Sequence, residues 1–418
     1  MKRFGWMTTA LMVTTLVNGT AHAGSLAVMS YNVRGLPAAV IENRTTQMAA
    51  IAPLLEDFHT PAAPYVGIDS IVLLQELFDQ GYYNTLTNPA TVTYPSKTAK
   101  DTSGPSFIGD GLNMLSDFTF TGFDRTQWNN CFGTGGGNGS DCDTNKGYSF
   151  ARFTLEAGVT VDVYNLHADA GQDEGSRAAR RANITQLATR INATSPTGTA
   201  VIVMGDTNSK YTRTPNDNMQ SLLSSTGVTD VWVQLRKAGV VPVAGADIDS
   251  SCSTDPSTGN CELVDKVFYR SGDNVTLTPT SYEALDDMFS DGGGADLSDH
   301  FPVAVTFDFT VPFVSTTSST STSTSTSTTT TTIPSRPCGD PLALIAGPMF
   351  QAGEGESAVY VVAASDALFT LRAVVGSTVC PICVCDVDSN GSIGAADALR
   401  VLKKAVGQDI TLTCAPCD

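Results

Sequence analysis

The feature that most limits how this chain can fold is a run of Ser and Thr from Ser315 to Thr332. Side chains of this kind cannot bury enough apolar surface to offset the loss of chain entropy, and such runs are typical of flexible, O-glycosylated linkers. The 418-residue chain is therefore predicted to fold in two parts, joined by a linker at residues 315–337. We expect a mixed α/β domain at residues 24–314 and a small Cys-rich module at residues 338–418.

The first 23 residues have the pattern of a secretory signal peptide. Lys2 and Arg3 precede an apolar run from Trp6 towards Val17, and Ala21-His22-Ala23 provides a cleavage site of small residues. The apolar run is shorter than a bilayer span, which disfavours a membrane anchor. We therefore expect an exported protein, secreted or at the cell surface, and a monomer.

Ten cysteines in an exported chain favour disulfides over thiolate metal sites. Cys131 with Cys142, and Cys252 with Cys261, are close pairs that would each close a loop rich in Gly or Ser. The other six lie near the C-terminus, at Cys338, Cys380, Cys383, Cys385, Cys414 and Cys417. Two C-x-x-C pairs among these six leave zinc as an alternative to disulfides.

The formal net charge of −18 disfavours a broad phosphate-binding surface. It does not exclude a nuclease, because bound divalent cations reverse the local charge in a cleft lined by carboxylates. Cationic contacts to nucleic acid could come from Arg34, Lys146, Arg177, Arg180 and Arg181. The alternative for those on a helix is an ordinary solvated face.

Strand-like apolar runs alternate with polar loops in the α/β part, and helical patterns are few. Predicted strands are Leu26–Tyr31, Ser70–Leu74, Leu112–Leu115, Tyr148–Leu155, Val161–Asn165, Ala200–Met204, Leu263–Tyr269 and Val303–Phe309. Residues 177–191 are predicted to form an amphipathic helix, since Ile184, Leu187 and Ile191 recur at helical spacing. This pattern predicts two packed sheets flanked by helices.

Polar side chains recur where six of these strands begin or end. They are Asn32, Glu76, Asn165 with His167, Asp206 with Asn208, Asp265, and Asp299 with His300. Each alone has an ordinary explanation as a turn residue, a helix cap or a structural histidine. Together they supply hard oxygen ligands for Mg²⁺, Mn²⁺ or Ca²⁺ and histidines that can move protons or stabilise a phosphoryl oxyanion.

The motifs SYNVRG, LLQE, GLNMLS, NKGYSFARF, YNLHADAG, GDTN, DKVF and LSDHFPV follow one another along the chain. In this order they resemble the motifs of the endonuclease/exonuclease/phosphatase superfamily, which is deoxyribonuclease I-like. This group of metal-dependent phosphoesterases includes pancreatic deoxyribonuclease, inositol-phosphate phosphatases and bacterial sphingomyelinases. The resemblance covers Gly24 to Phe309. It implies a four-layer α/β sandwich of two mostly antiparallel sheets flanked by helices, and in-line attack of water on a phosphodiester without a covalent intermediate.

The resemblance also implies a divalent-metal site for Mg²⁺ or Mn²⁺. Glu76 would be the principal ligand, with Asn32 beside it. Asp299 would lie near the metal.

The remaining polar residues would handle the water, the phosphate and the protons. Asp206 would orient or deprotonate the attacking water, and Asn208 would hold the scissile phosphate or a metal. His167 would donate to the phosphoryl oxygens in the transition state. His300 would be the general base or the proton partner of the phosphate, and Asp265 would orient its ring.

Three segments resemble those of bacterial sphingomyelinases: Asp141–Gly147, Gln75–Asp79 and the helix after His167 that carries Arg and Gln. They favour a phospholipid head-group ester as substrate, although Ala168-Asp169 departs from the sphingomyelinase pattern. Such enzymes need an apolar projection to enter the bilayer interface, and the candidate is Tyr282–Phe289, which could instead be a packed surface helix. An extracellular endonuclease acting on DNA or RNA and an inactive binding protein on the same fold remain alternatives.

The C-terminal module contains the pattern of a calcium-binding loop, for which a polar surface turn is the alternative. Oxygen ligands fall at positions one, three, five, seven (a carbonyl) and twelve, namely Asp386, Asp388, Asn390, Ser392 and Asp397. Gly391 permits the turn at position six, and Asp in place of Glu at position twelve resembles dockerin modules. Residues 365–376 parallel residues 396–407, so we expect a small helical module that binds Ca²⁺ and serves docking to a protein partner or surface attachment.

Overall fold

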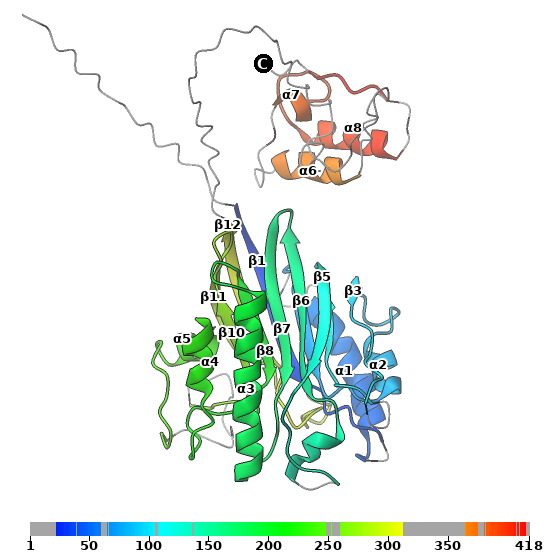
Figure 1. Cartoon of the computed structure of the whole chain (residues 1–418). Helices are drawn as coiled ribbons and strands as arrows, with labels where there is room; N and C mark the ends of the chain where they lie inside the picture. Colours follow the sequence, from blue (N-terminus) through cyan, green and yellow to red (C-terminus); the bar gives the residue numbers. More distant parts are fainter. Residues whose placement is uncertain are drawn as a thin grey trace, which may run out of the picture. The chain divides into compact units, whose positions relative to one another are not determined.

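The computed structural model describes residues 22–38, 40–59, 65, 67–104, 108–135, 138–247, 252, 260–311, 364–374, 380, 382–406, 408 and 410–414. The chain divides into two compact units, Met1–Thr316 and Thr317–Asp418 (Figure 1). The proposed linker and most of the signal segment lie outside the described residues. Strand β1 nevertheless begins at His22, so cleavage after Ala23 would remove only its first two residues.

The first sheet has the strand order β11-β12-β1-β2-β4-β3. Its strands are β1 (His22–Asn32), β2 (Ser70–Gln75), β3 (Ser96–Lys97), β4 (Asn113–Ser116), β11 (Thr276–Ala284) and β12 (Val303–Val311). β1 and β2 run parallel, and every other pair is antiparallel. Helix α1 (Arg44–His59) connects β1 to β2, as a parallel pair requires a crossover.

The second sheet has the order β5-β6-β7-β8-β10-β9. Its strands are β5 (Thr119–Gln127), β6 (Gly147–Glu156), β7 (Val159–His167), β8 (Val201–Asp206), β9 (Thr229–Asp230) and β10 (Asp265–Arg270). Here β7 and β8 are the parallel pair, and helix α3 (Glu174–Thr194) is their crossover. Helix α3 begins after Asp173, whose carboxylate accepts the Ser176 N–H as an N-cap.

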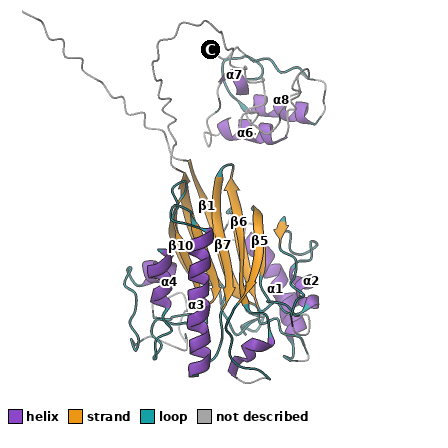
Figure 2. Cartoon of the chain, viewed as in Figure 1, coloured by secondary structure: helices purple, strands orange, loops and turns teal. Residues whose placement is uncertain are grey.

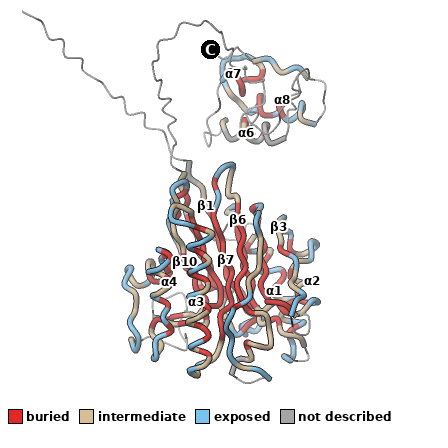
Figure 3. Tube along the Cα trace, in the orientation of Figure 1, coloured by how far each residue is buried: buried red, intermediate tan, exposed pale blue. Residues whose placement is uncertain are grey.

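The two sheets pack face to face, and helices cover their outer faces (Figures 1 and 2). Alternate residues of β1 face opposite ways, so Leu26 and Val28 join the core between the sheets while Met29 and Tyr31 pack with α1. The shorter helices are α2 (Gln80–Leu86), α4 (Met219–Thr226), α5 (Val231–Arg236) and the 3₁₀ helix at Asn138–Asp143. The buried strands form the centre of the unit in Figure 3. The expected four-layer α/β sandwich is confirmed.

All eight predicted strands are present, whereas β5 and β11 were not predicted from the sequence. β5 lies at a sheet edge and has no fully buried residue, so it lacks a regular apolar alternation. β11 is also an edge strand and carries Pro279 at a register shift. Helix α1 was missed as well, and it contains Pro53.

The apolar projection expected at Tyr282–Phe289 is wrong. Tyr282, Leu285 and Phe289 are all buried, and Tyr282 belongs to strand β11. Leu285 and Phe289 pack into the core beside α1. No helix forms within residues 260–311, so the surface-helix alternative is also wrong.

The C-terminal unit contains α6 (Ala364–Val374), α7 (Ile382–Cys385) and α8 (Ala395–Ala405). Ala367, Val387 and Val401 form a small core. Cys380 is paired with Cys385 rather than with Cys383, and no cysteine in the described residues is free.

In the first unit, the disulfides Cys131–Cys142 and Cys252–Cys261 form as expected. Among the described helices, none combines the length and apolarity needed to cross a bilayer.

Candidate active site

The predicted site residues come together where the central strands of both sheets end. Asn32 and His167 are the last residues of β1 and β7, and Glu76 follows the last residue of β2. Strand register aligns His167 with Asp206 on β8, and Asp206 with Asp265 at the start of β10. Sequence-distant polar residues are thus neighbours because the strands that carry them are paired.

Asn32 joins the two sheets at this edge. Its Nδ2 group donates to Glu76 Oε1 at 3.1 Å and to Asp206 Oδ2 at 3.1 Å. His167 faces the same two acids, with Nε2 lying 3.3 Å from Asp206 Oδ2 and 3.8 Å from Glu76 Oε1. Four of the predicted residues therefore form one contiguous cluster.

His300 lies between two buried acids on the second sheet. Its Nδ1 atom is 2.7 Å from Asp265 Oδ2, and its Nε2 atom is 3.7 Å from Asp206 Oδ2. Burial lowers the pKa of His300, but Asp265 and Asp206 raise it more, so that its pKa lies well above the usual value. Burial raises the pKa of Asp265, while the two histidines outweigh burial at Asp206 and hold its pKa well below the usual range.

Asn208 is held close to Asp206 by a tight turn. Its N–H donates to Asp206 Oδ1 at 2.8 Å, and its Nδ2 group donates to Ala168 O at 3.0 Å. Asn208 and Glu76 both have positive φ angles, of 49° and 57°, which non-glycine residues rarely adopt. Backbone strain of this kind is concentrated at functional sites.

Gly205 permits the close approach of β7 and β8 beside the site. A Cβ atom at this position would lie 2.1 Å from Leu166 O, and its φ of +148° also disfavours a side chain. The glycine in GDTN is therefore required by packing rather than by chemistry.

The donor set can accommodate a divalent cation. Ligand atoms of Glu76, His167 and Asp206 lie within 4.8 Å of one another, and so do those of Asp206, Asp265 and His300. Glu76 is the most open of these acids, with a side chain 20% exposed. Asp299 lies apart from both groups, because its half-exposed carboxylate pairs with Arg34 Nε at 3.2 Å.

Asn165 does not join this cluster, although it ends a predicted strand. Its Oδ1 accepts from Gln75 Nε2 at 2.8 Å, and its Nδ2 donates to Leu74 O at 2.9 Å. It thus bridges the sheets beneath the site and satisfies buried polar groups.

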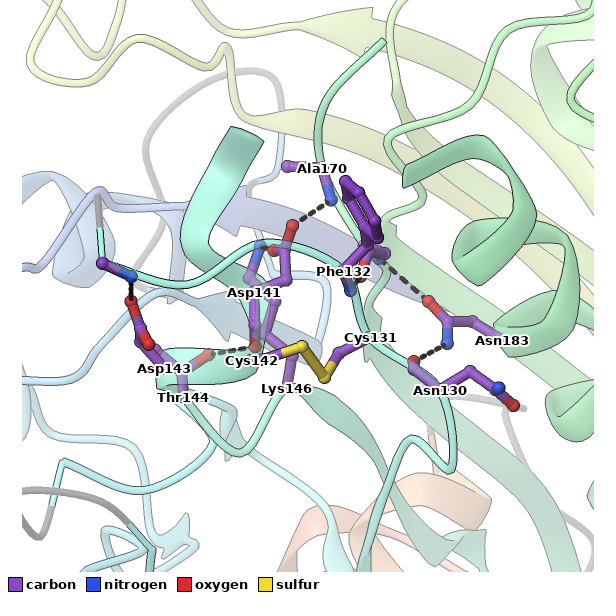
Figure 4. The surroundings of a disulfide bond; sticks show 12 residues. Asn130, Cys131, Phe132, Asp141, Cys142, Asp143, Thr144, Lys146, Ala170 and Asn183 are labelled. Carbon is purple, nitrogen blue, oxygen red and sulfur yellow. Dashed lines mark hydrogen bonds and ion pairs between the residues drawn. A yellow bond between two sulfur atoms is a disulfide. The ribbon is translucent and has the colours of Figure 1, made fainter. Parts of the chain in front are cut away.

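The segment Asp141–Gly147 lies beside the end of β7 (Figure 4). Asp141 accepts the Ala170 N–H at 2.9 Å and pairs with Lys146, and the Cys131–Cys142 disulfide closes the adjoining loop. Lys146 also lowers the pKa of Asp206, which places its charge near the site.

Asp169, which is part of the departure from the sphingomyelinase pattern, is buried in this same region. Its Oδ2 accepts the Phe132 N–H at 2.8 Å. Burial and the neighbouring Asp141 raise the pKa of Asp169 to about 7.

The arginines considered for nucleic-acid contacts are all engaged within the protein. Arg177 and Arg181 pair with Glu174, and Arg34 pairs with Asp299. Arg180 is not on a solvated face, since it is fully buried and pairs with Asp217 at 2.9 Å. This last pair was not predicted, because its members are 37 positions apart, one on helix α3 and one in a loop, and no local sequence pattern connects them.

The acidic loop of the C-terminal unit is folded around its own carboxylates. Asp386 accepts N–H groups from Asn390 and Gly391, and Asp397 accepts from Val387 and Gly394. Ligand atoms of Asp386, Asp388 and Asp397 lie within 4.8 Å of one another. The Ser392 N–H and hydroxyl both donate to Asn390 Oδ1.

The Endonuclease/Exonuclease/phosphatase family model matches residues 29–300. A sphingomyelinase of Mycobacterium tuberculosis is 32% identical over 320 residues, covering 72% of this chain and 57% of that protein. The chain thus spans somewhat more than half of this relative.

Among solved structures, sphingomyelinase C from Streptomyces griseocarneus is 19% identical with a TM-score of 0.46, covering 68% of this chain and 99% of that one. A Staphylococcus aureus beta toxin mutant with bound magnesium ions is 16% identical with a TM-score of 0.45, covering 67% and 98%.

Proposed function

This chain belongs to the endonuclease/exonuclease/phosphatase family, and we propose that it is an exported, Mg²⁺-dependent phosphodiesterase acting on a phospholipid head-group ester. One observation carries the catalytic part of the proposal: Asn32 contacts both Glu76 and Asp206, while His167 and His300 face the same Asp206 carboxylate. Two carboxylates, an amide and two histidines around one point suit the hydrolysis of a phosphate ester.

Glu76 and Asn32 would hold the cation, while Asp299, paired with Arg34 outside both donor groups, would act on it only from a distance. The carboxylate of Glu76 is the more open of the two acids around Asn32, and hard oxygen ligands are those that Mg²⁺ prefers. Mg²⁺ bound there would neutralise charge on the phosphoryl oxygens. In the orientation observed, the Nδ2 group of Asn32 faces both acids, so its oxygen would reach a cation after rotation of the amide.

The other residues would act directly on the water and the phosphate. Asp206 would orient or deprotonate the attacking water, and Asn208, whose amide lies 3.3 Å from Asp206 Oδ2, would hold the scissile phosphate. His167 would donate to the phosphoryl oxygens as negative charge develops. His300, with its ring oriented by the 2.7 Å contact to Asp265, would exchange the proton with water or phosphate.

A lipid substrate is supported by the mycobacterial relative and by the place of the Asp141–Gly147 segment at the site. The arginines that a nuclease would use are engaged in ion pairs within the described part of the chain, which weighs against nucleic acid. An inactive binding protein would not need the full set of acids and histidines.

A side-by-side assay on sphingomyelin, phosphatidylinositol and plasmid DNA tests this proposal. Each substrate is incubated with Mg²⁺ and with chelator. We expect hydrolysis of sphingomyelin in Mg²⁺ and none in chelator. Preferential cleavage of DNA would instead establish the nuclease, and no hydrolysis of any ester by a folded protein would favour the binding protein.

For the C-terminal unit we propose a Ca²⁺ site in the loop from Asp386 to Asp397, serving docking or surface attachment. Its support is the convergence of three carboxylates around a turn at Gly391. Calorimetric titration should detect one Ca²⁺ per chain, and Asp386→Ala should remove it. Binding that is equal in the Asp386→Ala variant would place the ion elsewhere.

A further inference from the structure

The buried ion pair of Arg180 and Asp217 has no part in the roles described above. Both side chains are fully buried, and Arg180 Nη2 lies 2.9 Å from Asp217 Oδ1. Removing two charges from water is costly, so a buried pair is weak evidence of a stabilising role. Its contacts instead connect the loops that follow β7 and β8.

On one side the pair holds the loop that follows β7. Arg180 Nη1 donates to Asp169 O at 2.8 Å and to Gly171 O at 2.9 Å. These carbonyls lie two and four residues beyond His167. Asn183, one turn further along α3, accepts the Asp169 N–H at 3.0 Å, so α3 holds this loop at two points.

On the other side the pair holds the loop that follows β8. Asp217 Oδ2 accepts the Lys210 N–H at 3.1 Å and pairs with Arg213. Arg213 Nη1 in turn donates to Asn208 O at 2.6 Å. The chain of contacts therefore runs from the backbone after His167, through two arginines and one aspartate, to the backbone of Asn208.

We propose that Arg180 and Asp217, extended by Arg213, are positioning residues that fix His167 and Asn208 relative to each other for the reaction. The pairing of β7 with β8 ends at His167 and Asp206, and just beyond it the Ala168 N–H donates to Asp206 O at 2.9 Å. Between the two loops themselves, the Asn208 amide donates to Ala168 O. The planar guanidinium contacts the two carbonyls through Nη1 and the carboxylate through Nη2, whereas an ammonium has all its donors on one nitrogen and cannot span the same positions. This inference rests on the proposed phosphodiesterase function.

The test replaces the pair with apolar side chains of similar size, in the double variant Arg180→Met/Asp217→Leu. Replacing a buried pair by apolar side chains commonly keeps or raises stability, but Arg213 also loses its Asp217 partner here. The melting temperature should therefore fall, and rates are compared well below it. Misplacement of catalytic groups by about 1 Å costs on the order of 100-fold in rate, so kcat should fall about 100-fold with KM changed less than about threefold. Arg180→Met alone should also lose stability, because it leaves Asp217 charged and buried.

Arg152 and Asp162 provide a control pair in which the aspartate is fully buried and the arginine is 43% exposed. They form a two-point ion pair at 2.6 and 2.9 Å on strands β6 and β7, and Asp162 is aligned with Val201 at the start of β8, away from the site. Arg152→Met/Asp162→Leu should keep wild-type kcat. If the Arg180/Asp217 double variant also keeps wild-type kcat, or if the two doubles lose activity equally, the inference is wrong.

Two further measurements cover other outcomes. A crystal structure of the Arg180/Asp217 double variant should show the Asn208 amide displaced from Ala168 O, and an unmoved amide would overturn the inference whatever the activity. If the amide is displaced in the double variant but the wild-type protein hydrolyses none of the phosphodiesters, only the proposed function would be overturned. If the double variant does not fold, Arg180→Lys serves in its place. A loss of kcat of about tenfold or more is expected, because the ammonium cannot keep the contacts of the guanidinium fork. Full activity is the contrary result.

Discussion

The two sheets contribute unequal halves to the site. The half from the second sheet is almost wholly buried, since the side chains of His167 and Asp206 are each 1% exposed. The half from the first sheet is more open, with Glu76 at 20%, His300 at 17% and Asp299 at 51% exposure, although Asn32 is fully buried. The buried half thus provides a fixed polar floor, and a cation, water and substrate can approach from the open half.

The halves are otherwise built alike, each on a parallel strand pair with a helical crossover. β1-α1-β2 supports Asn32 and Glu76, and β7-α3-β8 supports His167 and Asp206. Each crossover helix carries a buried arginine that binds loop carbonyls. Arg44 donates to Leu297 O at 2.8 Å and to Val33 O, as Arg180 does to the loop after β7. Similar supports thus hold halves that differ mainly in their access to solvent.

The largest effect is expected from the open half, where Glu76→Ala and His300→Ala should each lower kcat by on the order of 10³-fold. Glu76 has solvent access, so the melting temperature of Glu76→Ala should change little. His300→Ala should stay folded but melt at a lower temperature, because buried Asp265 loses its partner at 2.7 Å. Initial rates on a generic phosphodiester, with thermal melts beside them, check this. Wild-type rates in both variants would show that the site assignment is wrong.

A different signature is expected from the buried half. His167→Ala should lower kcat by about 10² to 10³-fold, the range for loss of one oxyanion donor, and should also lower the melting temperature. The reason for the second effect is that Asp206 would lose a partner while fully buried. A His167→Ala protein as stable as Glu76→Ala would remove the distinction between the halves.

Replacing Asp299 tests whether a residue at the edge of the open half contributes to the rate. Because its carboxylate is half-exposed and pairs with Arg34, Asp299→Ala should reduce kcat less than about tenfold. Its effect on the Mg²⁺ concentration for half-maximal rate should be similarly small. A large rise in that concentration would instead identify Asp299 as a metal ligand.

The smallest effect concerns stability and pH at Asp169. Its pKa is raised to about 7, so the folded state binds a proton that the unfolded chain has lost above about pH 4. This contribution to stability is complete below the unfolded pKa and is lost as pH rises through about 7. Asp169→Asn should therefore lose less stability between pH 5 and pH 8 than the wild type in thermal melts. Equal slopes would show that Asp169 is ionised throughout.

Much of the site was predictable because its residues sit at strand ends. A strand is recognised from its local apolar pattern, and a polar residue such as Glu76 directly after one stands out. β5 and β11 were not recognised because edge strands have one side without a neighbouring strand and carry weaker patterns. The projection at Tyr282 was misjudged for a related reason, since apolar side chains alone do not show whether they face core or solvent.

The sequence by itself determined the succession of strands, the two-part organisation and the identity of the polar residues at the strand ends. Each of these follows from periodicity or composition within a few residues. Only the tertiary structure decided which of them meet, through the registers that align His167 with Asp206 and Asp206 with Asp265. It alone also revealed the pairing of Arg180 with Asp217, because a buried ion pair between a helix and a distant loop depends on three-dimensional packing and leaves no local pattern in the chain.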